Sequence, residues 1–140
     1  MAVNGLKMKI LIVEDNEIVV KMLGAMLNKI DCAFDVALSG TKAIELYLAN
    51  CYDAIFMDIG LPDISGITAS KLIRQYNPFK KYTPIIALTA HSDNAYKEAA
   101  FKAGMDEFIP KPLEPQCIYD LISKLETGSY NKTKNVSSMQ

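Results

Sequence analysis

The stretch Lys-Ile-Leu-Ile-Val-Glu-Asp at positions 9–15 places a continuous apolar run directly before two acidic side chains. A short apolar run without polar interruption is typical of a strand that is buried on both faces of a sheet. Comparable runs occur at positions 54–57 and 85–88, with a shorter one at 108–109. The run at 34–37 is interrupted by a charge, which favours an edge strand. The pattern predicts five strands, the second of them at an edge.

The segments between these strands carry apolar residues at helical spacing. Helices are predicted around residues 19–30, 43–48, 67–76, 93–103 and 113–125. We expect Ser92 or Asp93 to cap the fourth helix and Gly104 to end it, since a helix end commonly needs a left-handed residue. The fifth helix is expected to start near Pro112 or Pro115. Five strands alternating with five helices through short links predict an α/β fold with a parallel sheet.

Two of these helices have well-defined apolar stripes that we expect to face the core. The stripe of the first helix is Val19, Met22, Leu23, Met26, Leu27 and Ile30, and that of the last is Leu113, Cys117, Ile118, Leu121, Ile122 and Leu125. Ile18 and Val20 fall on the two sides of the first stripe, so either neighbouring helices cover them or they are partly exposed and form an apolar docking patch.

The composition is that of one ordinary globular domain. The chain has 140 residues, of which 50% are hydrophobic and 22% are charged, and its net charge is -1. This charge disfavours a globally basic nucleic-acid binder. Residues 1–126 are expected to form the folded domain, whereas residues 127–140 are polar, lack a core face and read as a flexible tail.

Cellular context follows from the cysteines and from the short apolar runs. Cys32, Cys51 and Cys117 match neither a disulfide framework nor a zinc-ligand pattern, and we expect reduced core residues. The early apolar run ends at Glu14, so it is too short for a signal peptide or a membrane span. A cytoplasmic location is therefore expected.

Chemically active side chains follow the predicted strands. Ligands of open parallel sheets bind at the carboxyl ends of the strands, so we expect Glu14, Asp15, Asp58, Thr89 and Lys111 to converge there. Each has an ordinary explanation on its own, such as an acid at a helix start or an aspartate in a turn. Together, three converging carboxylates would repel one another unless a cation lies between them.

The donor set at this edge favours one kind of cation and one kind of chemistry. Oxygen ligands without His or Cys select a hard ion such as Mg²⁺, which commonly also binds phosphate oxygens. A carboxylate such as Asp58 can attack phosphorus to form an acyl phosphate. The metal, the lysine and the hydroxyl would then supply charge neutralisation and positioning.

The sequence around these residues resembles the receiver domains of response regulators over positions 9–125. The motifs are Ile-Leu-Ile-Val-Glu-Asp-Asn at 10–16, Phe-Met-Asp-Ile-Gly-Leu-Pro-Asp-Ile-Ser-Gly at 56–66, Pro-Ile-Ile-Ala-Leu-Thr-Ala at 84–90 and Ile-Pro-Lys-Pro-Leu at 109–113. The resemblance implies a flavodoxin-like (βα)5 fold, a five-stranded parallel sheet in the order 2-1-3-4-5 with helices on both faces.

The resemblance also implies roles for the residues at the strand ends. Asp58 would accept a phosphoryl group from a phosphohistidine, and it would bind Mg²⁺ together with Glu14, Asp15 and the backbone carbonyl of Gly60. Thr89 and Lys111 would contact the phosphoryl oxygens. The pair Glu14-Asp15 departs from the Asp-Asp of many relatives, and the longer Glu14 is a candidate for reaching the metal through water.

Two further positions carry implied roles. Phe108, three residues before Lys111, matches the aromatic residue that in many relatives turns inward when the threonine, here Thr89, moves. An ordinary core residue at a strand end is compatible with the same position. The Lys111–Pro112 bond matches the family's cis peptide.

The partners implied are a histidine kinase or a histidine phosphotransfer domain, with Ile18 and Val20 as the candidate docking patch. The domain would assist its own phosphorylation and dephosphorylation without being a conventional enzyme. The motifs at 87–91 and 103–113 look most like receivers of hybrid sensor histidine kinases, whose parent chain would be a histidine kinase and can be membrane-anchored. A weak homodimer is compatible with the family, and direct contact of this segment with nucleic acid or membrane is not expected.

Three other functions share parts of this pattern. A flavodoxin-like FMN module is disfavoured because Glu14 and Asp15 would repel its phosphate. A phosphatase of the haloacid-dehalogenase type needs a second aspartate where this chain has Gly60. A degenerate receiver that acts only as a binding module is disfavoured by the intact set of Asp58, Thr89 and Lys111.

Overall fold

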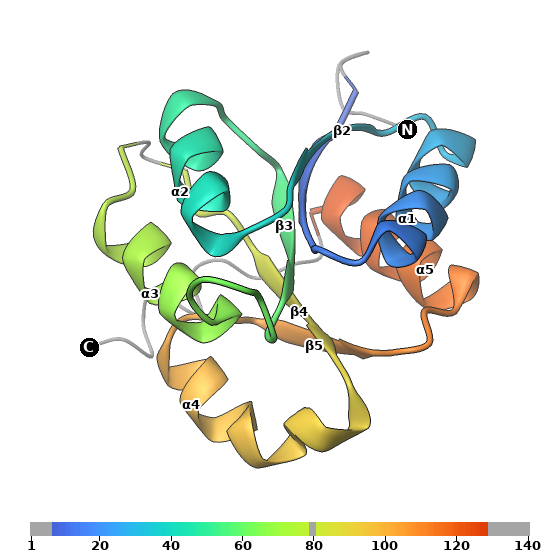
Figure 1. Ribbon diagram of the computed structural model, residues 1–140. Helices are drawn as coiled ribbons and strands as arrows, with labels where there is room; N and C mark the ends of the chain where they lie inside the picture. The colour runs from blue at the N-terminus through green and yellow to red at the C-terminus, as the bar shows by residue number, and fades with distance from the viewer. Residues whose placement is uncertain (1–6, 79–80, 129–140) are drawn as a thin grey trace.

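A five-stranded parallel sheet in the order β2-β1-β3-β4-β5 forms the centre of the computed structural model (Figure 1), which describes residues 7–78 and 81–128. The strands are β1 (Lys9–Val13), β2 (Ala33–Ala37), β3 (Ala54–Asp58), β4 (Ile85–Thr89) and β5 (Glu107–Pro110). The strand order and the α/β fold are as predicted. β2 lies at one edge of the sheet and, as its interrupted pattern indicates, is mostly only half-buried.

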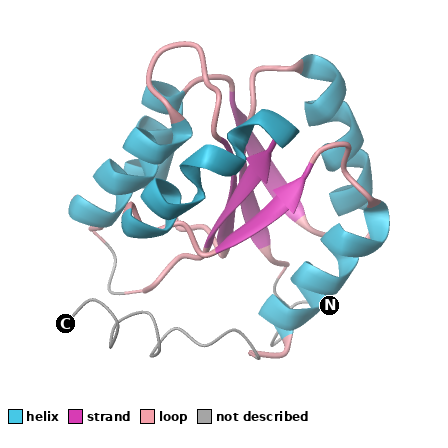
Figure 2. Cartoon of the chain, turned by 90° about the horizontal axis from the view of Figure 1, so that it is seen from below, coloured by secondary structure: helices cyan, strands magenta, loops and turns pink. Residues whose placement is uncertain are grey.

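Helices cover both faces of the sheet (Figure 2). They are α1 (Glu17–Lys29), α2 (Gly40–Ala49), α3 (Gly66–Gln75), the 3₁₀ helix η2 (His91–Tyr96), α4 (Lys97–Lys102) and α5 (Pro115–Glu126). α1 and α5 pack on one face, with Leu27 and Ile118 fully buried, and α2, α3 and α4 pack on the other, with Tyr47 and Ala100 fully buried. A hydrophobic core therefore lies on each face of the sheet, and the two cores fix the relative positions of the strand ends.

Successive side chains of β1 point alternately into these two cores. Ile10 and Ile12 face the core of α1 and α5, whereas Leu11 and Val13 face the core of α2 and α3. Each of these four side chains is 0% exposed. This explains why an uninterrupted apolar run forms a strand here, because both of its faces are covered.

The chain enters and leaves the fold at the edge opposite the carboxyl ends of the strands. Lys7 pairs with Asp31 in the turn before β2, at 3.1 Å between Nζ and Oδ1. Cys32 follows Asp31 directly, before β2. Burial raises the pKa of the Cys32 thiol, and the negative charge of Glu126, in the last turn of α5, raises it further. The end of α5 therefore also lies at this edge. The predicted tail 127–140 lies, beyond Gly128, outside the described residues.

The fourth predicted helix differs from the expectation of one helix over 93–103. It begins as the 3₁₀ helix η2 and becomes α-helical only from Lys97 to Lys102. Asp93 does not cap the start from the outside, because it lies inside the first turn and its Oδ2 accepts the Ala90 N–H at 2.8 Å. The side chain of Ser92 is not described. Gly104 ends the segment as predicted, with a φ of 101°.

Three side chains that we predicted to be core residues are exposed. Met22 is 40% exposed, because the buried apolar stripe of α1 narrows to Leu23, Met26 and Leu27. Cys51 lies exposed in the turn after α2, and Cys117 lies exposed in the first turn of α5. Among the described helices, none combines the length and the apolarity that crossing a membrane requires.

Candidate functional site

The carboxyl ends of the strands are level with one another because of the register of the parallel sheet. The residues paired at this edge are Val13 with Ala37 and with Met57, Asp58 with Leu88, and Thr89 with Pro110. Glu14 continues from β1 and donates its N–H to the Ala37 carbonyl at 3.0 Å, and Lys111 continues from β5 and donates its N–H to the Thr89 carbonyl at 2.8 Å. The register thus gathers the predicted side chains at one edge.

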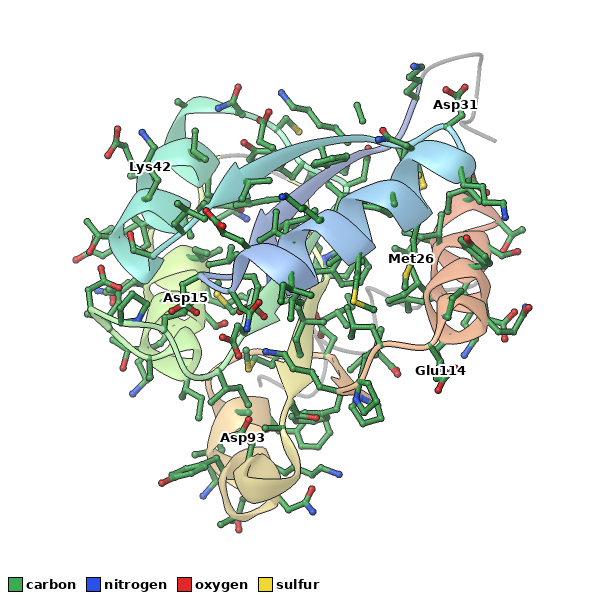
Figure 3. All side chains as sticks on the ribbon, turned by 45° about the vertical axis from the view of Figure 1, so that its right-hand side comes forward. Asp15, Met26, Asp31, Lys42, Asp93 and Glu114 are labelled. Atoms are coloured by element: carbon green, nitrogen blue, oxygen red, sulfur yellow. The ribbon has the colours of Figure 1, made fainter. Side chains whose placement is uncertain are left out.

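Three carboxylates form an acidic cluster at the carboxyl ends of the strands, and one of them, Asp15, is labelled in Figure 3. Oxygen atoms of Glu14, Asp15 and Asp58 all lie within 4.8 Å of one another. Glu14 is 1% exposed and Asp58 is 6% exposed, whereas Asp15 is open to solvent. The cluster therefore has two buried members and one accessible side.

The ammonium group of Lys111 partly neutralises this cluster. Its Nζ lies 2.7 Å from Glu14 Oε1 and 3.3 Å from Asp58 Oδ1. Asp15 makes no ion pair with any other described residue. Three carboxylates and one ammonium leave an excess of two negative charges, which matches the charge of a divalent cation. The all-oxygen donor set agrees with a hard ion.

Burial and charge shift the pKa values of the buried pair. The pKa of Glu14 is raised by burial and by the charge of Asp58, against the opposing effects of Lys111 and of the Asn16 N–H. Burial alone would lower the pKa of Lys111, but its hydrogen bond to Glu14 and the negative charge of Asp58 outweigh burial and raise it. Lys111 therefore stays protonated at neutral pH.

The backbone after β3 holds Asp58 in place through two glycines. The Gly60 N–H donates to Asp58 Oδ1 at 3.3 Å. Gly66 begins α3 and packs directly on the end of β3, where an added Cβ would lie 2.2 Å from the Asp58 carbonyl oxygen. A side chain at position 66 thus has no room, whereas a Cβ at Gly60 would meet nothing within 4 Å.

The same loop is tied to α2 by a residue that sequence reasoning did not single out. The Asp63 carboxylate accepts the N–H groups of Gly40 and Thr41, each at 2.9 Å, and the Thr41 hydroxyl. These hydrogen bonds hold the pKa of Asp63 well below its ordinary value, the Thr41 hydroxyl having the largest effect. The partners lie more than twenty residues away in sequence, so no local pattern indicated this contact.

Thr89 ends β4, and Phe108 lies within the neighbouring strand β5, where it pairs with Ala87. Thr89 is 5% exposed and its hydroxyl donates to the Ile109 carbonyl at 3.4 Å. The half-buried ring of Phe108 packs edge-to-face against Phe101 of α4, with 4.8 Å between the ring centroids. The Lys111–Pro112 peptide bond is cis.

α1 starts beside the acidic cluster, capped by Asn16. The Asn16 carboxamide accepts the N–H groups of Ile18 and Val19 at 2.9 and 3.3 Å. Ile18 is 70% exposed, and Val20 is only half-buried. An apolar side chain is thus presented to solvent in the first turn of α1, close to Asp15.

Fold and site together define a class: a doubly wound parallel α/β protein with a cation-competent acidic cluster and a lysine at its carboxyl edge. The "Response regulator receiver domain" family profile matches residues 10–123. The chain therefore belongs to the response-regulator receiver family.

Relatives place receivers of this kind in histidine kinases. The chain is 36% identical to the signal transduction histidine-protein kinase BarA of Escherichia coli (strain K12) over 124 residues, which cover 89% of the chain and 13% of BarA. The chain thus corresponds to a small part of that kinase. This match agrees with the resemblance to receivers of hybrid kinases.

Two solved structures of similar receiver domains contain a bound metal ion and a bound partner protein, respectively. The receiver domain of sensor histidine kinase PA1611 from Pseudomonas aeruginosa, solved with a magnesium ion in its active-site cleft, is 30% identical with a TM-score of 0.78, covering 87% of this chain and 99% of that one. The receiver domain of Ssk1 from Saccharomyces cerevisiae, solved with the histidine phosphotransfer protein Ypd1, is 30% identical with a TM-score of 0.79, covering 90% of this chain and 93% of that one.

Proposed function

We propose that Asp58 is the phosphoryl acceptor of this receiver and that it takes the group from a phosphohistidine of a partner protein. The observation that carries this proposal is the acidic cluster. Oxygen atoms of Asp58, Glu14 and Asp15 lie within 4.8 Å of one another, and Asp58 also pairs with the Lys111 ammonium group. A carboxylate oxygen can attack phosphorus directly, without a general base to remove a proton from a hydroxyl nucleophile.

Glu14, Asp15 and Asp58 would hold Mg²⁺ with help from the Gly60 carbonyl. The fit rests on the oxygen donors and on the excess of two negative charges at the cluster. The magnesium bound in the PA1611 receiver supports the same assignment. When bound, the ion neutralises charge on the phosphoryl oxygens and lets an anionic donor approach the acids. Because Glu14 is buried against Lys111, we assign it contact through water.

The transfer step follows from the positions of the protein's own groups. An oxygen of Asp58 forms the new bond to phosphorus while the bond from phosphorus to the donor's imidazole nitrogen breaks, and the electron pair returns to that nitrogen. Lys111, already within 3.3 Å of Asp58, neutralises a phosphoryl oxygen. Thr89 would turn its hydroxyl from the Ile109 carbonyl to a second phosphoryl oxygen. The ring of Phe108 would then turn inward beside it.

Labelling with a small phosphodonor tests this proposal. We expect Mg²⁺ and acetyl phosphate to add one base-labile phosphoryl group per chain, measured by intact mass. Asp58→Ala and removal of divalent metal by EDTA should each abolish the product. Labelling that persists under either condition would overturn the assignment. Asp53→Ala, a change in a carboxylate before β3 that pairs with Lys81, is the matched control and should still be labelled.

The partner is proposed to be a histidine kinase or a histidine phosphotransfer domain in the cytoplasm. The complex of the Ssk1 receiver with Ypd1 supports this kind of partner. The match to part of BarA supports a parent chain of the hybrid-kinase type. Phosphotransfer would then pass between the kinase histidine, Asp58 and a second histidine.

A further inference from the structure

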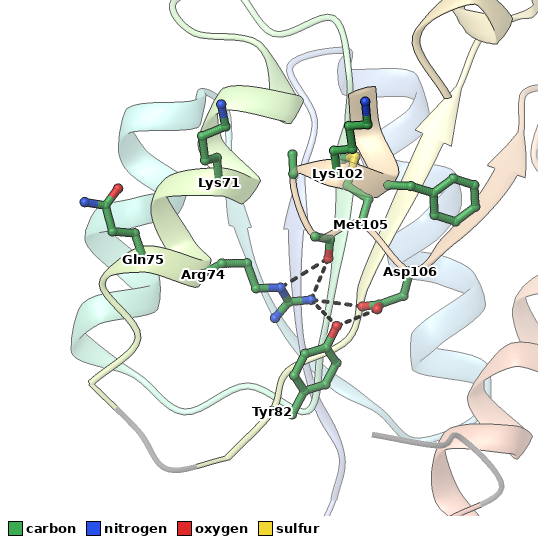
Figure 4. Close-up of a pocket in the computed structure, with 10 residues that line it drawn as sticks. Lys71, Arg74, Gln75, Tyr82, Lys102, Met105 and Asp106 are labelled. Atoms are coloured by element: carbon green, nitrogen blue, oxygen red, sulfur yellow. Dashed lines mark hydrogen bonds and ion pairs between the residues drawn. The ribbon is translucent and has the colours of Figure 1, made fainter. Parts of the chain in front are cut away.

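A cavity of about 480 Å³ lies between α3 and α4 (Figure 4). It is lined by residues that precede β4 and β5, at the edge of the sheet opposite the carboxyl ends of the strands. Its walls come from the second half of α3, the last turn of α4 and the segments that lead into β4 and β5. Small-molecule pockets typically measure roughly 300–1,000 Å³. The cavity is therefore large enough for an organic ligand and is separate from the acidic cluster.

A hydrogen-bond network built on Arg74 holds the floor of this cavity in place. The guanidinium donates to the carbonyls of Gly104 and Thr83, at 2.8 and 2.7 Å, and to the Tyr82 hydroxyl at 2.9 Å. It also pairs with Asp106 at 2.9 Å, and both side chains of that pair are at most 14% exposed. α3 is thus fixed to the starts of β4 and β5, and the negative charge of Asp106 is neutralised.

The rim of the cavity is positively charged. Lys71 of α3 and Lys102 of α4 extend in parallel from their helices (Figure 4), and within the described chain Lys71 makes no ion pair. Lys102 pairs with Glu98 at 3.3 Å, but both side chains are more than three-quarters exposed, so the pair is weak. Since Arg74 and Asp106 cancel, the two lysines set the sign of the potential in the cavity.

One wall of the cavity is aromatic and unusually open. Phe101 is 56% exposed, although its ring packs edge-to-face with that of Phe108. Buried Met105 and Ala103 continue this apolar surface. A large exposed aromatic ring next to cations fits a ligand that offers both an apolar face and a negative charge.

We propose that this cavity binds a small organic anion with a planar apolar body and a carboxylate, sulfonate or phosphate group. The apolar body would lie against Phe101 and Met105, and the anionic group would lie between Lys71 and Lys102. The Arg74 network would stay intact, because each of the three guanidinium nitrogens already donates a hydrogen bond within the protein. The site makes no use of Asp58, so it stands independently of the phosphoacceptor assignment.

Anilinonaphthalene sulfonate is a probe with this chemistry, and uncharged phenylnaphthylamine is its matched neutral counterpart. We expect saturable binding of the sulfonate by fluorescence titration, with amide shifts confined to residues 71–75 and 101–106 in a ¹H–¹⁵N spectrum. Replacing Lys71 and Lys102 together by Gln should weaken the sulfonate about tenfold and hardly affect the neutral probe, as expected for two surface charges. Lys29→Gln with Lys124→Gln, on α1 and α5, is the matched control and should change neither.

A second variant tests the apolar wall. Phe101→Ala should weaken both probes, with a thermal melt to show that the fold is retained. The proposal is overturned if the Lys71 and Lys102 substitutions leave sulfonate affinity unchanged, if binding does not saturate, or if the shifts lie at another surface such as Ile18. Asp58→Ala should bind the sulfonate like the wild type, which separates this result from any failure of the phosphoacceptor assignment.

Discussion

The Lys111 ammonium compensates a carboxylate that is almost inaccessible to water, since Glu14 is 1% exposed and lies 2.7 Å away. We expect Lys111→Ala to lower the free energy of unfolding by about 1–3 kcal/mol in EDTA, because Glu14 is left as a buried charge without this partner. It should slow labelling of Asp58 more severely, because a phosphoryl oxygen also loses its cation. Urea unfolding and acetyl phosphate labelling measure the two effects.

The double variant separates these two roles of Lys111. Adding Glu14→Gln to Lys111→Ala should recover part of the lost stability, since it removes the uncompensated charge, and should leave labelling slow. A double variant no more stable than Lys111→Ala would contradict the charge argument. A Lys111→Ala chain that is simply unfolded would remove support for a role at the phosphoryl group.

Gly66 and Gly60 form a matched pair for testing how tightly the backbone holds Asp58. Gly66→Ala should destabilise the fold by about 1–3 kcal/mol or more, as overpacking does, because its Cβ would lie 2.2 Å from the Asp58 carbonyl oxygen. Gly60→Ala should be nearly neutral in urea unfolding, since its Cβ meets nothing within 4 Å. Equal effects of the two substitutions would refute this view of the loop.

At the level of elements, Asp63 joins the loop after β3 to the start of α2. Its pKa is lowered, so it stabilises the fold at pH values above the ordinary aspartate pKa of about 3.9, and this stabilisation is lost as the pH falls through the lower folded-state pKa. Asp63→Ala should reduce the Tm by a few degrees at pH 7, and the difference from the wild type should shrink below about pH 4.

A neighbouring carboxylate on α2 serves as the control for this pH dependence. Glu45 pairs only at the surface with Lys42, and its side chain is 68% exposed. Glu45→Ala should therefore hardly change the Tm at either pH. A constant Tm difference for Asp63→Ala between pH 7 and pH 3 would show that the loss is not electrostatic.

For the whole molecule, recognition of a protein partner should depend on the apolar start of α1. Ile18→Ser should slow phosphotransfer from a phosphorylated histidine phosphotransfer domain about tenfold, as loss of an apolar interface anchor typically does, and leave acetyl phosphate labelling unchanged. Val20→Ser should slow transfer too, but its half-buried side chain will also lower the Tm. Rapid-quench transfer assays measure this difference.

Leu48 provides the matched control because it is an exposed apolar residue on α2, on the other face of the sheet. Leu48→Ser should not change transfer from the protein partner. If Ile18→Ser slows both donors equally, or neither, α1 is not the docking surface.

The fold could be predicted largely from local patterns, because the part of a strand that is covered on both faces is apolar, as residues 10–13 of β1 and 54–57 of β3 are. The gathering of Glu14, Asp58 and Lys111 was also predictable, since a parallel sheet brings its strand ends to one edge. The Asp63–Thr41 contact was not, since it joins residues far apart in sequence. The exposure of Met22 and Cys117 was not either, since the width of a buried stripe depends on the neighbouring helices.

Both ends of the described chain lie at the edge of the sheet away from Asp58, where Lys7 pairs with Asp31 and α5 closes at Glu126. A polypeptide joined to either end is therefore led away from the acidic edge. The domain can therefore be inserted within a longer chain, or follow another domain through a linker, and its acidic edge stays accessible to a partner protein. The same arrangement is compatible with a separate regulator and with a receiver domain within a kinase.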